Sequence, residues 1–356
     1  MQPLLIGALM DGLHMDGGSA GLLGSIELGA VALASFALAP RMGTISRRLL
    51  SCVGAVLAVL GYGGSMLAAS FASLAVCRVA AGVGAGMVLA IGNAAVSACR
   101  HPERVYAQMT IAGTVALTAL LALLPLAIAR FAYRGGYGGM AAIALALLPA
   151  LLWIPDTISG TREHVEIEPV ASRLGVATLL AAGLLFFAQS GVWAFAERIG
   201  TRAQLNHTAI GVVLASSTLA GLCGAGLANR VGTEYGRTLP LSSGMVATGL
   251  TLLALGSVRT PRAYTVLLIL NGIAYLFMVP YILGVAAALD RQGRWAAATI
   301  GAATVGAALG PGVVGPVIET HGYAAMAWVV FAAAMVAAIA VTPVARALDR
   351  RDDVDS

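Results

Sequence analysis

Two ionisable residues stand inside apolar segments and are the first candidates for chemistry. Arg78 lies in CRVAAGVGAGMVLAIGNAA, residues 77–95, and Glu27 lies in an earlier apolar segment. A guanidinium stays charged at physiological pH, so in an apolar environment it must face water or a partner. A nearby carboxylate can gain a proton, which breaks the ion pair. We expect Glu27 and Arg78 to couple charge or protons. The alternatives are a fixed structural pair and an Arg78 side chain that extends to the membrane surface.

A second group of polar and aromatic residues recurs at helical spacing. Four of them, at spacings of three, four and four, share one face of a helix, two more lie four residues apart, and one stands alone. We expect them to line a substrate cavity: Phe186, Gln189, Trp193, Glu197, Asn271, Tyr275 and Asn93. Trp193 and Glu197 could instead form an interfacial belt and loop anchor. The amides of Gln189, Asn93 and Asn271 could instead join helices by hydrogen bonds.

Other chemistry finds little support in the sequence. The five histidines lie in predicted loops or helix ends, and none has a paired metal-ligand spacing. The glycine-rich segment GVGAG lacks the lysine of a phosphate-binding loop. The four cysteines show no CxxC spacing and are expected to be packing residues. We therefore predict no enzymatic activity, no cofactor and no metal.

Composition identifies the environment that must position these residues. Hydrophobic residues make up 59% of the 356 residues and charged residues only 10%, which is typical of an integral membrane protein. Runs of about 20 apolar residues, enough to cross a bilayer as a helix, recur along the chain. We predict an all-α polytopic membrane protein with full spans at 18–40, 50–69, 72–98, 107–129, 136–154, 172–196, 208–228, 239–257, 263–288, 295–318 and 323–345.

The first residues, MQPLLIGALMDGLH, form an apolar run that is too short to cross a bilayer. We interpret this run as the second half of a twelfth helix, the first along the chain, and expect a start codon placed too late. A signal peptide is the alternative, but no basic segment precedes the run.

The arginines predict the orientation, since the chain has no lysine. Apart from Arg78, most arginines fall in segments on one side of the predicted spans, which is therefore cytoplasmic. The other side receives Arg130, Arg134, Arg198, Arg202, Arg259 and Arg262. We expect a multi-pass protein of the inner (plasma) membrane with both termini in the cytoplasm if the first helix is complete. The net charge of +5 follows this orientation and gives no reason to expect a nucleic-acid partner.

A polar segment near the middle of the chain divides it into two halves. We predict a bundle over residues 1–154, a cytoplasmic linker over 155–171, a second bundle over 172–346 and a tail over 347–356. RMGTISRR, from Arg41, and RVGTEYGR, from Arg230, follow corresponding spans of the two halves. Such internal repeats build many transporter folds.

These motifs resemble those of the major facilitator superfamily of secondary transporters. Its cytoplasmic signature is matched in part, and Pro40 and Asn229 stand where the family has aspartate. The matching residues are Arg41, Gly43 and Arg48 in the first half, and Arg230, Gly232 and Arg237 in the second. A second signature is matched by Arg78 with Gly82, Gly84 and Gly86. The resemblance implies two six-helix bundles, with the first, fourth, seventh and tenth helices around a central cavity.

The sequence thus predicts a secondary transporter that moves a small organic solute by alternating access, with proton coupling. It is expected to be a monomer in the lipid bilayer. The alternatives are an exporter of drugs or metabolites, a membrane sensor or assembly protein that does not transport, and an inactive chain that lacks half a helix. The fifth span has no Gly-Pro pair, which disfavours a multidrug exporter.

Overall fold

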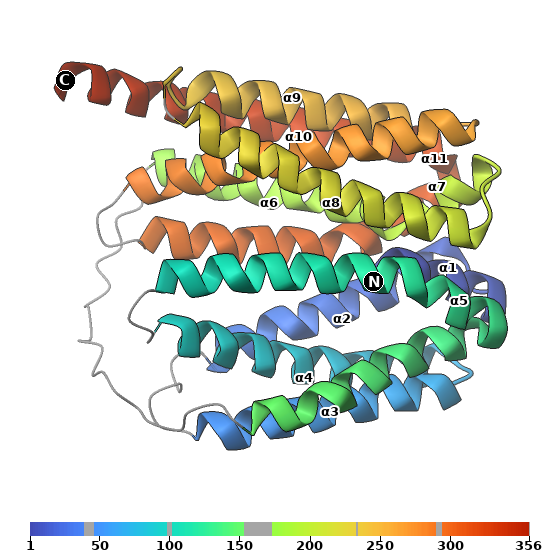
Figure 1. Ribbon diagram of the computed structural model, residues 1–356. Helices are drawn as coiled ribbons and strands as arrows, with labels where there is room; N and C mark the ends of the chain where they lie inside the picture. The colour runs from blue at the N-terminus through green and yellow to red at the C-terminus, as the bar shows by residue number, and fades with distance from the viewer. Residues whose placement is uncertain (39–45, 98–101, 153–172, 233, 290–293, 356) are drawn as a thin grey trace.

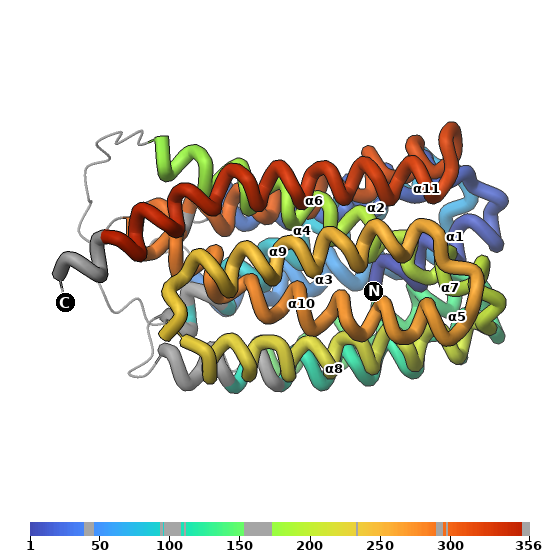
Figure 2. Tube along the Cα trace, turned by 90° about the horizontal axis from the view of Figure 1, so that it is seen from above, coloured from blue at the N-terminus to red at the C-terminus, as the bar shows by residue number. Residues whose placement is uncertain are grey.

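The structure, a computed structural model, describes residues 1–356 except 39–45, 98–101, 153–172, 233, 290–293 and 356. All regular secondary structure in the described part is helical. The helices are α1 (Gln2–Leu13), α2 (Gly17–Leu38), α3 (Arg47–Leu67), α4 (Phe71–Ser97), α5 (Pro102–Leu151), α6 (Arg173–Ala194), α7 (Ala196–Arg202), α8 (His207–Val231), α9 (Thr238–Leu255), α10 (Pro261–Ala288) and α11 (Arg294–Asp355). Figure 2 shows that the long helices run along one common direction.

The two longest helices reverse direction at a single residue. Ala132 in α5 has φ 51° and Gly322 in α11 has φ 78°, both outside the helical region. Gly322 lacks a Cβ and adopts this backbone easily, whereas Ala132 carries a Cβ into the same region. Figure 1 shows each helix running to the right and then back to the left. Both helices are therefore helical hairpins.

The helices meet the length and composition needed to cross a membrane. Nine of them in the described part do so, among them the segments Ala112–Leu151 and Ala298–Arg350 of 40 and 53 residues. Since a span needs about 20 residues, each of these two segments is long enough for two spans. Helix α1 has 12 residues and is shorter than a span. The structure agrees with a polytopic helical membrane protein, and the total of twelve helices stays a prediction.

The two halves of the chain form two groups of helices that lie side by side (Figure 1). In the first group α4 packs on α2 and α3, and α3 also packs on α5. In the second group α6 and α9 pack on α11, and α8 packs on α10. The largest contacts between the groups are α2 with α11 and α5 with α8.

The contact between α2 and α11 is closest at one end of the molecule. We call this the α7 end, because α7 lies there together with the end of α1 and the start of α2; it is on the right in Figure 1. A Cβ on Gly21 would lie 2.3 Å from the carbonyl oxygen of Pro311, so the two backbones touch. The backbone N–H of Gly17 donates to Glu319 Oε2 at 3.1 Å, and that of Gly312 donates to Ser25 Oγ at 2.7 Å.

Toward the opposite end the same two helices separate. There the ring of Phe36 lies against Gly301, so a large side chain takes the place of backbone contact. Figure 1 shows α2 leaning away from the first part of α11 toward the left. The two halves are therefore closed against each other at the α7 end.

Candidate functional site

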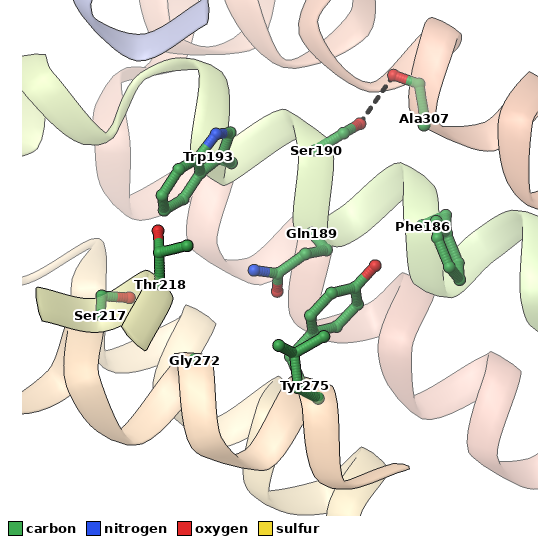
Figure 3. A pocket seen from close by; sticks show the side chains of 10 residues that line it. Phe186, Gln189, Ser190, Trp193, Ser217, Thr218, Gly272, Tyr275 and Ala307 are labelled. Carbon is green, nitrogen blue, oxygen red and sulfur yellow. Dashed lines mark hydrogen bonds between the residues drawn. The ribbon is translucent and has the colours of Figure 1, made fainter. Parts of the chain in front are cut away.

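A pocket with a volume of about 270 Å³ lies within the second half of the molecule (Figure 3). It is lined from four helices, near the middle of α8, of α10 and of the part of α11 that precedes Gly322, and toward the end of α6. The lining residues are Phe186, Gln189, Ser190, Trp193, Ser217, Thr218, Gly272, Tyr275, Leu276 and Ala307. The pocket thus contains four of the predicted cavity residues, contributed by the seventh and tenth predicted helices.

The aromatic residues of the pocket come from two helices. Phe186 and Tyr275 meet edge to face, with ring centroids 5.8 Å apart and an interplanar angle of 69°. Figure 3 shows the rings of Trp193, Tyr275 and Phe186 placed around the amide of Gln189. This arrangement offers ring faces and edges on which a flat molecule can stack.

Gln189 is held in place by a chain of hydrogen bonds behind the pocket. Its Nε2 donates to Asn271 Oδ1 at 2.9 Å, and Asn271 Nδ2 donates to Thr251 Oγ1 at 3.0 Å. The Thr251 hydroxyl donates in turn to backbone carbonyls of α9, at 3.0 Å and 2.8 Å. Because those carbonyls can only accept, the chain has one direction, and Gln189 Oε1 is left without a partner among the described residues.

Of the other predicted cavity residues, one is not described and one lies in another cavity. Asn93 falls within α4, but its side chain lies outside the described residues. Glu197 is 2% exposed and belongs to α7, where it lines a different cavity of about 360 Å³ with Asp11 and His207. The stripe of polar residues along one helix is therefore divided, because α6 ends at Ala194 and the chain turns before α7 begins.

Arg78 is 1% exposed and lies in the interior of the first half. Its Nη1 donates to Glu27 Oε2 at 3.0 Å, and its Nη2 donates to Ser65 Oγ at 3.0 Å. The guanidinium also lies 4.9 Å from the ring centre of Tyr62 and 4.3 Å from that of Tyr137, within the range of a cation–π interaction. The expected ion pair is present, and its role in coupling stays a prediction.

Glu27 has a third partner, since the Tyr62 hydroxyl donates to its Oε1 at 3.0 Å. The side chains of Tyr62, Ser65 and Tyr137 complete the surroundings of the ion pair. Their spacing in the sequence did not predict this. A hydroxyl from a neighbouring helix shows no periodic pattern, so only the fold could identify these residues. The pair joins α2 to α4 and is supported by α3 and α5, all within one half of the molecule.

Two glycines that follow Arg78 bring α4 against α2. A Cβ on Gly82 would lie 2.4 Å from the carbonyl oxygen of Glu27, and one on Gly86 would lie 2.4 Å from that of Val31. Gly84, on the other face of α4, packs against α3 at Gly54 instead. The backbone of α2 thereby approaches closely enough for the short ion pair between Glu27 and Arg78.

A network of charged side chains joins the two halves at the α7 end. Arg198 on α7 pairs with Asp11 on α1 at 2.8 Å and donates to the carbonyl oxygen of Gly7. Glu197 Oε1 lies 2.9 Å from His207 Nδ1 and accepts from the Thr201 hydroxyl at 3.1 Å. Burial raises the pKa of Glu197 above its ordinary value, although Arg198, His207 and Thr201 act in the opposite direction. The spacing of these residues in the sequence did not predict that they meet.

Three members of this network, Asp11, Glu197 and His207, place one ligand atom each within 4.8 Å of the others. Such a spacing could hold a metal ion. Arg198, however, lies 2.8 Å from Asp11 Oδ1 and 3.5 Å from Glu197 Oε2, so its positive charge already balances the carboxylates. We therefore interpret the group as an ion-pair network.

The cytoplasmic motif residues are described only in part. Arg41 and Gly43 lie outside the described residues, and Arg48 lies in the first turn of α3. In the second motif Arg230 lies in the last turn of α8, and Gly232 ends that helix with φ 51°.

The second motif is also bonded to the end of the chain. The backbone N–H of Arg237 donates to Asp349 Oδ1 at 2.8 Å, and that of Thr238 donates to Asp349 Oδ2 at 3.0 Å. Asp349 thus caps the start of α9 from α11. The sequence did not single out this residue.

Comparison with known proteins gives structural relatives only. No family model matches the chain, and no curated protein matches it. The crystal structure of the nucleoside transporter NupG superposes with a TM-score of 0.77 at 15% identity, over 96% of this chain and 94% of that chain. A bacterial homologue of the human lysosomal transporter Spinster, in an inward-facing and occupied conformation, superposes with a TM-score of 0.73 at 14% identity, over 98% and 93% of the two chains.

The fold and the apolar helices define an integral, multi-pass helical membrane protein. Its fold is that of the major facilitator superfamily, to which both structural relatives belong. Both relatives are transporters, and the prediction of a protein without enzymatic activity agrees with them.

Proposed function

We propose that this chain is a secondary transporter that moves a small organic solute by alternating access of two six-helix bundles, residues 1–154 and 172–346. The observation that carries the proposal is the close backbone contact of the two halves at the α7 end, together with a pocket near the middle of the helices of the second half. A solute site between an end that is closed and an end where the halves separate is what alternating access requires. In this proposal the hairpins α5 and α11 supply two spans each, and α1 is the first of twelve helices.

The α7 end is proposed to face the outside. Arg198, Arg202, Arg259 and Arg262 lie at this end of the second half. The opposite end of that half holds Arg173, Arg230, Arg237, Arg346 and Arg350. An excess of arginine marks the cytoplasmic side. In this orientation the pocket is closed to the outside, and the cytoplasm lies at the end where α2 and α11 separate.

Glu27 is the proposed site of proton coupling, with Arg78 as its partner. The Glu27 side chain retains 15% of its exposure, whereas that of Arg78 retains 2%. A proton could therefore reach the carboxylate while the guanidinium stays buried. Protonation would release Nη1 of Arg78 and loosen the contact between α2 and α4.

Nucleosides are the first solutes to test, because NupG transports nucleosides and its fold covers nearly all of this chain. The test is uptake by proteoliposomes that contain the purified protein, with and without an imposed pH gradient. We expect accumulation of at least one solute that requires the gradient. We expect Glu27→Gln to exchange that solute but not to accumulate it.

The outcomes separate the candidate functions. Accumulation by Glu27→Gln equal to that of the parent would remove Glu27 as the coupling site. Movement only out of the vesicles would favour an exporter. Absence of any movement across a panel of nucleosides, sugars and amino acids would favour a protein that does not transport.

A further inference from the structure

The pocket between α6, α8, α10 and α11 carries information about the chemistry of its ligand. We propose that it binds an uncharged, flat ring that carries an N–H or O–H donor, and that Gln189 Oε1 selects for this donor. The inference rests on the proposed function, in which this pocket is the solute site, and it adds the substrate class.

The absence of charge in the pocket excludes charged ligands first. None of the described lining residues is acidic, basic or a histidine. A charged group taken from water into such a site loses its hydration and finds no opposite charge, which is strongly unfavourable. The pocket therefore favours a ligand without net charge.

The three aromatic side chains favour a flat ring over a bulky saturated one. Phe186 and Tyr275 already meet edge to face at 5.8 Å, so together they present both a ring face and a ring edge. Trp193 adds a third aromatic surface on the other side of Gln189 in Figure 3. Aromatic pairs prefer such offset or edge-to-face arrangements, and a flat ligand can extend the set.

Gln189 supplies the polar selection. Its Nε2 is committed to Asn271, and the direction of the chain through Thr251 prevents the amide from turning over. Its Oε1 is a buried acceptor without a partner among the described residues. A buried carbonyl oxygen without a donor is costly, so a ligand donor that pairs with it gains affinity. Because the atom is covered in this conformation, we expect the side chain to shift toward the pocket when a donor binds.

Ser190 is not available for the same task. Its hydroxyl donates to the carbonyl oxygen of Ala307 at 2.8 Å, across to α11 (Figure 3). Ser217 likewise donates to the carbonyl oxygen of Leu268 at 2.9 Å. Both hydroxyl groups donate their protons to backbone carbonyl oxygens. Among the described lining atoms, Gln189 Oε1 is therefore a buried acceptor that still lacks a donor.

The test is binding of matched ring compounds to the purified full chain, measured by calorimetry and by quenching of tryptophan fluorescence. The probes are benzamide, N,N-dimethylbenzamide, cyclohexanecarboxamide, benzoate and benzyltrimethylammonium. We expect benzamide to bind about tenfold more tightly than its dimethyl derivative, which lacks the donor, the effect of about one hydrogen bond to a buried acceptor. We expect the saturated and the charged compounds to bind more weakly than benzamide.

The variants Gln189→Met and Phe186→Leu test which side chain selects the donor and which contributes to binding of the ring. Met has a similar length but no acceptor, so the preference for benzamide over its dimethyl derivative should fall to near unity. Phe186→Leu should weaken all ring compounds and keep that preference. Tighter binding of benzoate or of the ammonium compound, equal binding of the two amides, or no binding of benzamide would overturn the inference. Binding is measured without transport, so the two proposals can fail separately. Uptake of a solute without this binding selectivity would refute the inference about the pocket. Selective binding without uptake of any solute would refute the proposed transport function.

Discussion

Asp11 and Arg198, from different halves of the chain, form an ion pair of 2.8 Å at the α7 end. The Asp11 side chain is 53% exposed and that of Arg198 is 14% exposed. An ion pair so close to solvent contributes only about 0–1 kcal/mol, which suits a contact that would break during the proposed transport cycle.

Asp11→Asn is expected to favour opening at the α7 end. Loss of an exposed ion pair, roughly 1 kcal/mol or less, would raise by up to about fivefold the rate at which a cysteine at Thr218 reacts with a charged, impermeant thiol reagent added only from the α7 side. The measurement uses a chain whose four native cysteines are replaced. Asp16→Asn is the matched control, since the Asp16 side chain accepts hydrogen bonds from Ser19 of the adjoining α2. Equal acceleration by both variants would contradict a specific role for Asp11.

Closure at the α7 end is expected to depend on pH through Glu197. Burial raises the pKa of Glu197 in the closed state, and opening returns the carboxyl to water and to its ordinary pKa. The closed state thus binds the proton more tightly. Closure is strongest at acid pH and is lost as the pH rises through the raised pKa.

The accessibility of Thr218→Cys, corrected for the reactivity of the same thiol in the unfolded chain, tests this dependence. Glu197→Gln should remove it. His207→Gln and Arg198→Ala should change it, because His207 and Arg198 oppose the shift, and Asp11, which adds to it, faces the same carboxylate. Faster labelling at acid pH than at neutral pH would reverse the sign and refute the assignment.

Arg78→Ala is expected to destabilise the protein by about 3 kcal/mol, because it leaves Glu27 in the bundle without its cation. Arg78→Lys should cost less stability but impair transport, since one ammonium group cannot reproduce the bonds of two guanidinium nitrogens to Glu27 and Ser65. Thermal unfolding of both variants, alone and combined with Glu27→Gln, checks this. We expect the double variant, Arg78→Ala with Glu27→Gln, to be more stable than Arg78→Ala alone. Equal stabilities of these two variants would show that the charges of Glu27 and Arg78 do not stabilise each other.

Gly82→Ala is expected to destabilise the protein by about 1–3 kcal/mol, because the added Cβ would lie 2.4 Å from the Glu27 carbonyl oxygen and push α2 away. Gly92→Ala on the same helix is the control, since no described atom lies within 4 Å of a Cβ there. Alanine also favours a helix over glycine, so the control should be neutral or more stable. Unfolding in detergent compares the two, and equal stabilities would argue against close packing at Gly82.

Much of the architecture follows from the sequence because lipid imposes strong rules. Long apolar runs predicted the spanning helices, and the two ionisable residues inside apolar runs, Glu27 and Arg78, were predicted as partners and form an ion pair. Periodicity could not predict the network of Asp11, Glu197, Arg198 and His207, since these residues lie at helix ends and in the short helix α7, and the two halves must pack before Asp11 meets the others. Periodicity also grouped Glu197 with Trp193 on one helix face, whereas α6 ends at Ala194 and Glu197 belongs to α7.

The central claim is that the two halves rock against each other. Spin labels at Leu49 on α3 and Leu239 on α9, which are 63% and 62% exposed, report the separation of the halves at the end opposite α7. Labels at Leu49 and Leu89 lie within the first half and serve as the control. The account predicts that Asp11→Asn and a rise in pH, which both favour opening at the α7 end, shorten the distance between Leu49 and Leu239 and leave that between Leu49 and Leu89 unchanged. A distance between Leu49 and Leu239 that stays the same under every one of these conditions would contradict it.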